Sequence, residues 1–191
     1  MNERKKIELR VANLTSSQTQ AGAYILVLSE VGTRRSVPII IGISEAQAIM
    51  LELKGIMTPR PLTHVLFASV LEALGVKLLR AVIYKAEKGI FYTYLYLRSG
   101  QMILRVDSRT SDAVALALRM KAPILIYEDI LDAESTMKGL HDDLHDIPSG
   151  NDRIINVDWL KEALQKAIDE EDYEQAAVLR DQINHLKEPN S

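Results

Sequence analysis

Residues whose side chains could carry out chemistry are concentrated between positions 106 and 119, where an apolar helical run begins. Asp107, Arg109 and Asp112 fall within six consecutive positions. Two carboxylates at this spacing could share a divalent cation such as Mg²⁺ through their oxygens, and a guanidinium could bind a phosphate group. The sequence therefore predicts Asp107, Arg109 and Asp112 as catalytic residues of phosphodiester cleavage, with Asp107 and Asp112 as metal ligands.

The same residues can also be explained without a ligand. Ser111 or Asp107 could cap the helix that follows, and Asp112 would then complement the positive end of its dipole. His64 lies in the first turn of another apolar helix, near Arg60 in the chain. We predict His64 as a general base, although a hydrogen-bonded core histidine would fit the same position. Both interpretations stay open.

Three arginines are predicted to bind nucleic acid: Arg60, Arg105 and Arg109. A guanidinium contacts phosphate through charge-assisted hydrogen bonds and can do so at any base sequence. Glu45, at a second junction between strand and helix, could be a third carboxylate of the site. It is explained equally well by the preference for acidic residues in the first turn of a helix.

Two other patterns have a functional and a structural interpretation. Tyr92, Tyr94 and Tyr96 alternate along one strand, as in a base-stacking platform or in a half-buried sheet face. His141 and His145 are four residues apart, as in zinc-binding helices, but Asp stands where that motif has Glu. No third ligand is evident for them, and we interpret this segment as an acidic linker.

Alternating apolar residues and turn residues predict the elements that must position these side chains. Strands are expected at residues 5–14, 23–31, 35–42, 76–86, 90–99 and 101–107, and a short buried strand with a helical turn within 122–131. Helices are expected after a capping box formed by Ser44 and Gln47, at residues 62–75, and after the polar stretch that ends at Asp112.

Residues 37–53 and 102–118 match in their apolar positions at an offset of 65. This indicates an internal repeat, in which each half has three strands followed by a helix. The predicted fold class is therefore α+β, with a mixed sheet built from two such halves and a C-terminal helical hairpin. The expected domains are residues 1–135, an acidic linker at 136–155 and the hairpin at 156–188.

Charge is distributed unevenly along the chain. Residues 1–131 carry 17 Lys and Arg against 11 Asp and Glu, whereas residues 132–191 carry 6 against 15. A basic body with an acidic tail is typical of a protein that binds a polyanion, although two solvated surfaces would give the same numbers. Cysteine is absent, which excludes disulfides, a thiol nucleophile and a cysteine-based zinc site. Neither a membrane span nor a signal peptide is evident, so we expect a cytoplasmic protein.

Several blocks together resemble the bifunctional nuclease family, over about residues 5–135: "PIIIGISEAQAI", "RPLTHVLFASVLEALG", "FYTYLYL" and "DSRTSDAVALALRMKAPILIYEDIL". The tail, with "DYEQAAVLRDQI", resembles the UVR motif of bacterial excision-repair and protease-adaptor proteins. The resemblance implies a mixed α+β fold, homo-oligomers, activity on DNA and RNA, and a hairpin that binds a protein partner. The chain departs from the family pattern at Val65, where aspartate is usual, and at Thr110, where proline is usual.

We therefore expect a nuclease with a C-terminal interaction hairpin, with a divalent cation such as Mg²⁺ as a possible cofactor. The alternative is a non-catalytic adaptor or regulator in DNA repair or stress proteolysis, acting through the UVR-like hairpin. Convergence of the carboxylates, Arg109 and His64 in one open basic cleft would favour the enzyme. Separate positions for them, each satisfied by structural contacts, would favour the adaptor.

Overall fold

The computed structural model describes residues 4–17, 22–33 and 35–135, together with nine residues between 164 and 180. Contacts divide the chain into two units, Met1–Met57 with Pro61–Ile147, and Thr58–Arg60 with Pro148–Ser191. The described residues between 164 and 180 are helical, and Ala176 and Leu179 among them are buried. The linker at 136–155 and most of the hairpin lie outside the described residues, so those two predictions stay predictions.

The first unit contains a seven-stranded sheet, in the order β3-β2-β1-β7-β4-β5-β6. β7 is parallel to β4, and every other pair of neighbours is antiparallel. The sheet is thus mixed, and the predicted α+β class is confirmed. The strands are β1 (Lys6–Ser16), β2 (Ala23–Glu30), β3 (Ser36–Gly42), β4 (Val76–Glu87), β5 (Ile90–Ser99), β6 (Met102–Arg109) and β7 (Ile124–Tyr127).

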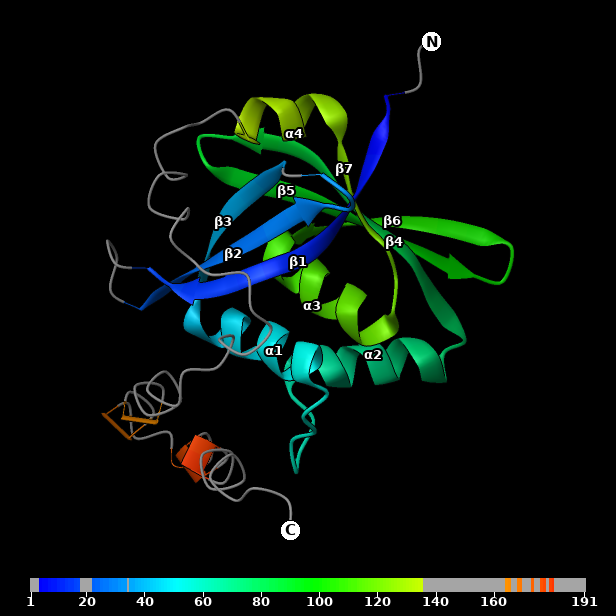
Figure 1. Cartoon of the computed structure of the whole chain (residues 1–191). Coiled ribbons are helices and arrows are strands. Elements are labelled where there is room, and N and C mark those ends of the chain that lie inside the picture. Colours follow the sequence, from blue (N-terminus) through cyan, green and yellow to red (C-terminus); the bar gives the residue numbers. More distant parts are fainter. Residues whose placement is uncertain are drawn as a thin grey trace. The chain divides into compact units, whose positions relative to one another are not determined.

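Within the described part of residues 4–135, four helices accompany the sheet, and all of them were expected from the sequence. They are α1 (Ile43–Lys54), α2 (Thr63–Ala73), α3 (Thr110–Met120) and α4 (Glu128–Ser135). Figure 1 shows α1, α2 and α3 together on one side of the sheet and α4 on the other. Three antiparallel strands followed by a helix occur twice in the chain, β1–β3 with α1 and β4–β6 with α3. A duplicated origin for these halves remains a prediction.

α3 forms the centre of the core. Five consecutive residues of this helix, from Ala113 to Ala117, are at most 3% exposed. α3 packs against α1 and α2 and against β4, β5 and β6, so nearly every face of the helix is covered. A helix that is apolar all round is stable only in such surroundings. The packing therefore fixes the start of α3, where the polar residues of the predicted site lie.

The predicted helix caps are wrong. α1 begins one residue after Gly42 and α3 one residue after Arg109, and neither helix has a side-chain capping bond. The capping box of Ser44 and Gln47 is absent because β3 runs directly into α1, which places Ser44 inside the first turn. Ser111 is likewise inside α3. A capping side chain must precede the helix to accept hydrogen bonds from its first N–H groups, and Ser111 does not.

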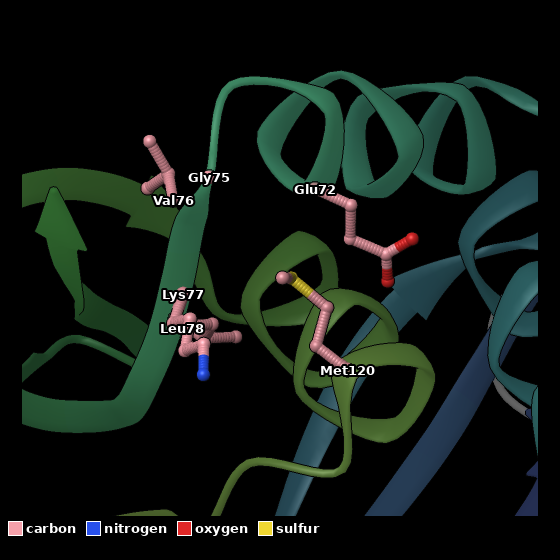
Figure 2. Close-up of a pocket in the computed structure, with 6 residues that line it drawn as sticks. All are labelled: Glu72, Gly75, Val76, Lys77, Leu78 and Met120. Atoms are coloured by element: carbon pink, nitrogen blue, oxygen red, sulfur yellow. The ribbon is translucent and has the colours of Figure 1, made fainter.

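A pocket of about 340 Å³ lies between the end of α2, the start of β4 and the last residue of α3 (Figure 2). Glu72 and Met120 come from the two helices, and Lys77 and Leu78 come from the strand. Met120 is at the opposite end of α3 from Asp112. The pocket therefore does not contain the residues predicted to carry chemistry.

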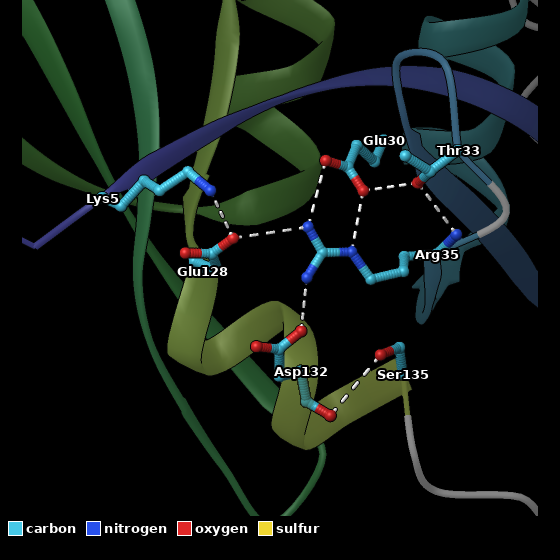
Figure 3. Close-up of polar contacts among 7 residues, drawn as sticks. All are labelled: Lys5, Glu30, Thr33, Arg35, Glu128, Asp132 and Ser135. Atoms are coloured by element: carbon cyan, nitrogen blue, oxygen red, sulfur yellow. Dashed lines mark hydrogen bonds and ion pairs between the residues drawn. The ribbon is translucent and has the colours of Figure 1, made fainter.

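A polar network ties the turn between β2 and β3 to the start of α4 (Figure 3). The Arg35 guanidinium lies 2.8 and 3.0 Å from the two Glu30 carboxylate oxygens and 3.6 Å from Glu128, and it also contacts Asp132. Lys5 donates to Glu128 at 2.7 Å. The network joins residues about 100 positions apart in sequence, Arg35 and Asp132.

We expect Arg35→Gln to raise the pKa of Glu30 from about 2 towards its ordinary value of 4.5. The pKa is low mainly because Arg35 hydrogen-bonds the carboxylate, with a further bond from Thr33. An unfolded glutamate titrates near 4.5, so this pair stabilises the fold above that pH and stops doing so as pH falls through about 2. NMR titration of the Glu30 carboxyl measures the shift.

The matched control is Lys85→Gln, which removes a different surface ion pair, with Glu87. It should leave the Glu30 pKa where it is. A Glu30 pKa that stays near 2 in the Arg35 variant would contradict the role given to the guanidinium.

Candidate functional site

Three charged residues meet where the first turns of α1 and α3 lie together, and we call them the corner cluster: Glu45, Arg109 and Asp112. Arg109 Nη1 lies 2.8 Å from Glu45 Oε1. Arg109 Nε and Nη2 donate to the two Asp112 oxygens at 2.8 and 3.0 Å. One guanidinium therefore bridges two carboxylates that are far apart in sequence.

The local structure explains how the cluster forms. Arg109 is the residue before α3, and Asp112 is the third residue of that helix. Glu45 is the third residue of α1, and its carboxylate lies against Gly42, where a Cβ would collide with it. Counted from the helix starts, Glu45 and Asp112 occupy equivalent positions, at an offset of 67 rather than 65. Packing of α1 on α3 then brings both acids to one arginine.

Exposure and charge decide what the corner cluster can do. The Arg109 side chain is 68% exposed and that of Asp112 50%, whereas Glu45 is 20% exposed. The bond to Asp112, helped by Glu45, raises the pKa of Arg109, so the guanidinium stays charged. Two helix N-termini beside an exposed cation favour an anion such as phosphate, whereas the carboxylates of Glu45 and Asp112 in the same first turns oppose it. A phosphate that binds Arg109 here competes with the two carboxylates.

Asp107 is held apart from the corner cluster. It pairs with Tyr94 across β5 and β6, and its Oδ1 accepts a hydrogen bond from the Tyr84 hydroxyl at 3.1 Å. Asp112, in contrast, is bound at both oxygens by Arg109. Among the residues that the structure describes, no three His, Asp or Glu side chains come together as a metal-binding group. A cation shared by Asp107 and Asp112 therefore stays a prediction.

His64 is the second residue of α2 and is half-buried. Its Nε2 is buried without a hydrogen-bond partner. Burial lowers the pKa of His64, and the negative charges of Glu52 and Asp112 partly offset this decrease. The imidazole is therefore neutral near pH 7, and its buried Nε2 must be opened to water before it can act as a general base.

We expect the protein to lose stability as pH falls below about 6.5, in part because of His64. The unfolded histidine takes up a proton near that pH, whereas the folded one does so only at lower pH. His64→Gln should remove this part of the pH dependence, measured as urea unfolding at pH 7 and pH 5.5. Equal pH dependence of the variant and the wild type would contradict the lowered pKa.

The remaining predicted arginines lie elsewhere. Arg105 is on the exposed strand β6, with its guanidinium carbon 4.5 Å above the Tyr94 ring. Arg60 is exposed in the segment between α1 and α2 and belongs to the second unit, Thr58–Arg60 with Pro148–Ser191. The structure thus gathers Arg109, Asp112 and Glu45, whereas Arg105 and Asp107 contact tyrosines of the sheet, Tyr94 and Tyr84.

One face of β4–β6 carries four tyrosines and three cations. Tyr84 and Tyr94 are stacked, with ring centroids 3.8 Å apart and an angle of 8° between the rings. Arg105 covers Tyr94, and two further cations cover the other rings, Arg80 over Tyr96 and Lys85 over Tyr92. The ring faces are therefore occupied by cations and by one another, as in a half-buried sheet face.

Sequence reasoning missed Tyr84 and gave Glu45 no firm role. Tyr84 shares a face with Tyr94 because it lies two residues after Val82, which is opposite Tyr94 in the register of β4 and β5. Alternation alone does not say which strands are neighbours, so the contact of Tyr84 with Asp107 of β6 could not be predicted from it. For Glu45, the available signal was an acid in the same helical position as Asp112.

A family model described as the bifunctional nuclease domain matches residues 26–138, and one described as the UvrB/UvrC motif matches residues 159–188. Uncharacterized proteins from two strains of Mycobacterium tuberculosis, CDC 1551 / Oshkosh and ATCC 25618 / H37Rv, are each 40% identical over 124 residues. These matches cover 65% of this chain and 73% of each relative. Within the described part of the chain, none of the helices has the length and hydropathy needed to cross a bilayer.

Proposed function

Because the chain belongs to the bifunctional nuclease domain family, we propose that it is a nuclease that hydrolyses phosphodiester bonds in DNA and RNA. The observation that carries the proposal is the exposed Arg109 guanidinium, held at two helix N-termini in a domain of this family. Such a position suits the negative charge that develops on phosphate in the transition state.

The chemistry assigned to each residue follows from its surroundings. A water oxygen attacks phosphorus, and the water proton passes to a base. The P–O bond to the leaving sugar oxygen breaks, and that oxygen takes up a proton from solvent. His64 is proposed as that base because it is neutral with an unpartnered Nε2. Arg109 neutralises the phosphate oxygens, and Asp112 positions Arg109. A divalent cation at Asp107 or Asp112 would supply further charge neutralisation.

The experiment uses highly purified wild type and variants on labelled single-stranded RNA, single-stranded DNA and duplex DNA, with Mg²⁺ or with chelator. Arg109→Ala should reduce the cleavage rate by about 10²–10³-fold, as expected for loss of one charge-stabilising donor. Asp112→Asn and His64→Gln should also reduce it, and Asp107→Asn tests the metal prediction.

The control is Arg98→Ala, which removes an exposed arginine of β5 outside the corner cluster. It should cleave like the wild type. Equal residual cleavage by all these proteins would show contamination or another site, and the assignment to the corner cluster would fail.

Two observations support a second candidate function, a protein-interaction adaptor: the UvrB/UvrC motif match, and the separation of Asp107, bound by Tyr84, from Arg109, bound by two carboxylates. In this case residues 159–188 recruit a partner in DNA repair or proteolysis and the first domain has no catalytic role. The adaptor predicts no cleavage by pure protein under any of these conditions. The nuclease predicts cleavage that survives deletion of residues 159–188.

A further inference from the structure

β6 is the edge strand of the sheet and has no neighbour beyond it in the described chain. Large apolar side chains are exposed on both of its faces: Met102 is 61% exposed, Ile103 58%, Leu104 41% and Val106 43%. In Figure 1 the turn between β5 and β6 projects beyond the helices. An edge with open backbone groups and apolar side chains favours pairing with another strand.

The other edge strand shows how this protein protects an edge. β3 contains Pro38, which has no N–H to donate, and Ile40 is its one apolar residue that is exposed, at 57%. β6 contains neither proline nor lysine, and its register with β5 is continuous from Met102 to Arg109. The protection present on β3 is therefore missing from β6.

We propose that two copies of this chain pair edge to edge through β6, antiparallel, about a twofold axis at Val106. The two seven-stranded sheets then form one continuous sheet. The proposal does not depend on nuclease activity, and it specifies a surface and a register that neither the family nor the proposed function supplies.

The charges of β6 select this register. Arg105 and Asp107 lie on one face, opposite Tyr96 and Tyr94 of β5, with Val106 between them on the other face. In a twofold pair centred on Val106, Arg105 lies opposite Asp107 of the partner subunit, and this ion pair forms twice. Centring on Arg105 would place two guanidiniums opposite each other, which destabilises a strand pair.

Within one copy each charge contacts a tyrosine of β4 or β5, and pairing across the edge must compete with these contacts. The Tyr84 hydroxyl holds Asp107 at 3.1 Å, and Arg105 lies over the Tyr94 ring at 4.5 Å. Both side chains are exposed, so each is available to the opposite strand. On the other face, Val106 meets Val106 of the partner subunit, and Leu104 lies opposite Ser108 of the partner subunit.

The first test exploits the absence of cysteine from the chain. In the full-length protein, Val106→Cys places two thiols directly opposite each other, with Cβ atoms roughly 4.5–5.5 Å apart, close to the span of a disulfide. Mild oxidation should give covalent dimers rapidly. Leu104→Cys is the matched control, because Leu104 lies on the same face as Val106 and is almost equally exposed. In the proposed pair, however, the two introduced cysteines would lie about 13 Å apart along the strands.

The second test is a charge exchange followed by sedimentation velocity. Arg105→Asp and Asp107→Arg each place like charges opposite each other twice, which should weaken the dimer about tenfold. The double variant Arg105→Asp/Asp107→Arg restores opposite charges and should recover the wild-type dissociation constant. This recovery depends on the register and would not follow from a general loss of folding.

Three results would overturn the proposal. They are a wild type that is monomeric at all concentrations, equal cross-linking of the Val106→Cys and Leu104→Cys proteins, and a dimer that the single charge variants leave unchanged. The last would place the contact between copies on another surface, such as the exposed Leu66 and Val70 of α2.

Discussion

Thr110→Val is expected to lower the free energy of unfolding by about 1–3 kcal/mol, the cost of leaving buried polar groups unpaired. The Thr110 side chain is 4% exposed, and its hydroxyl donates to the Phe91 carbonyl at 2.9 Å. The same hydroxyl lies 2.7 Å from that of Thr93, which is 1% exposed. Valine keeps the shape and removes both bonds. Urea unfolding measures the difference.

A double-mutant cycle isolates the hydroxyl pair. Thr93→Val removes one bond and leaves the bond from Thr110 to Phe91 in place, so it should cost less than Thr110→Val. The double variant should cost less than the sum of the two, because neither hydroxyl is then left without its partner. Thr15→Val, at a half-buried position on β1, is the control, expected within about 0.5 kcal/mol of wild type. Additive costs would contradict the coupling.

Leu116→Ala is expected to lower the free energy of unfolding by about 2–5 kcal/mol, the range for a leucine removed from a tight core. Leu116 is 2% exposed at the centre of α3, which packs against two helices and three strands. The matched control is Leu66→Ala, since Leu66 lies on α2 and is 53% exposed. It should cost under about 1 kcal/mol. Similar losses for both variants would show that α3 is not the centre of the core.

Most of the fold could be predicted from the sequence because its signals are local. Strands such as β5 alternate between buried and half-buried residues, and the turns before and after it contain Gly89 and Gly100, both with positive φ. The helix starts could not be placed exactly, because β3 and β6 continue into α1 and α3 without a loop. Ser44 therefore has the sequence signature of a cap without the conformation of one.

The candidate site was predictable only where its members are neighbours in sequence. Arg109 and Asp112 are three residues apart, and their contact follows from the helix that Asp112 begins. The bond from Arg109 to Glu45 depends on the packing of α1 on α3, and the bond from Tyr84 to Asp107 depends on the pairing of β4, β5 and β6. Neither tertiary contact is encoded by local spacing.

The position of β7 has a consequence for how this protein is made. β7 occupies the middle of the sheet, where it pairs Ile124 with Leu9 of β1 and with Ala81 of β4. During translation, the first three strands are synthesised long before residue 124. The edge of β1 that pairs with β7 therefore stays unpaired while more than 100 further residues are added. Closure of the sheet across such a separation is slow. Nascent chains are therefore expected to need a chaperone until the last strand emerges.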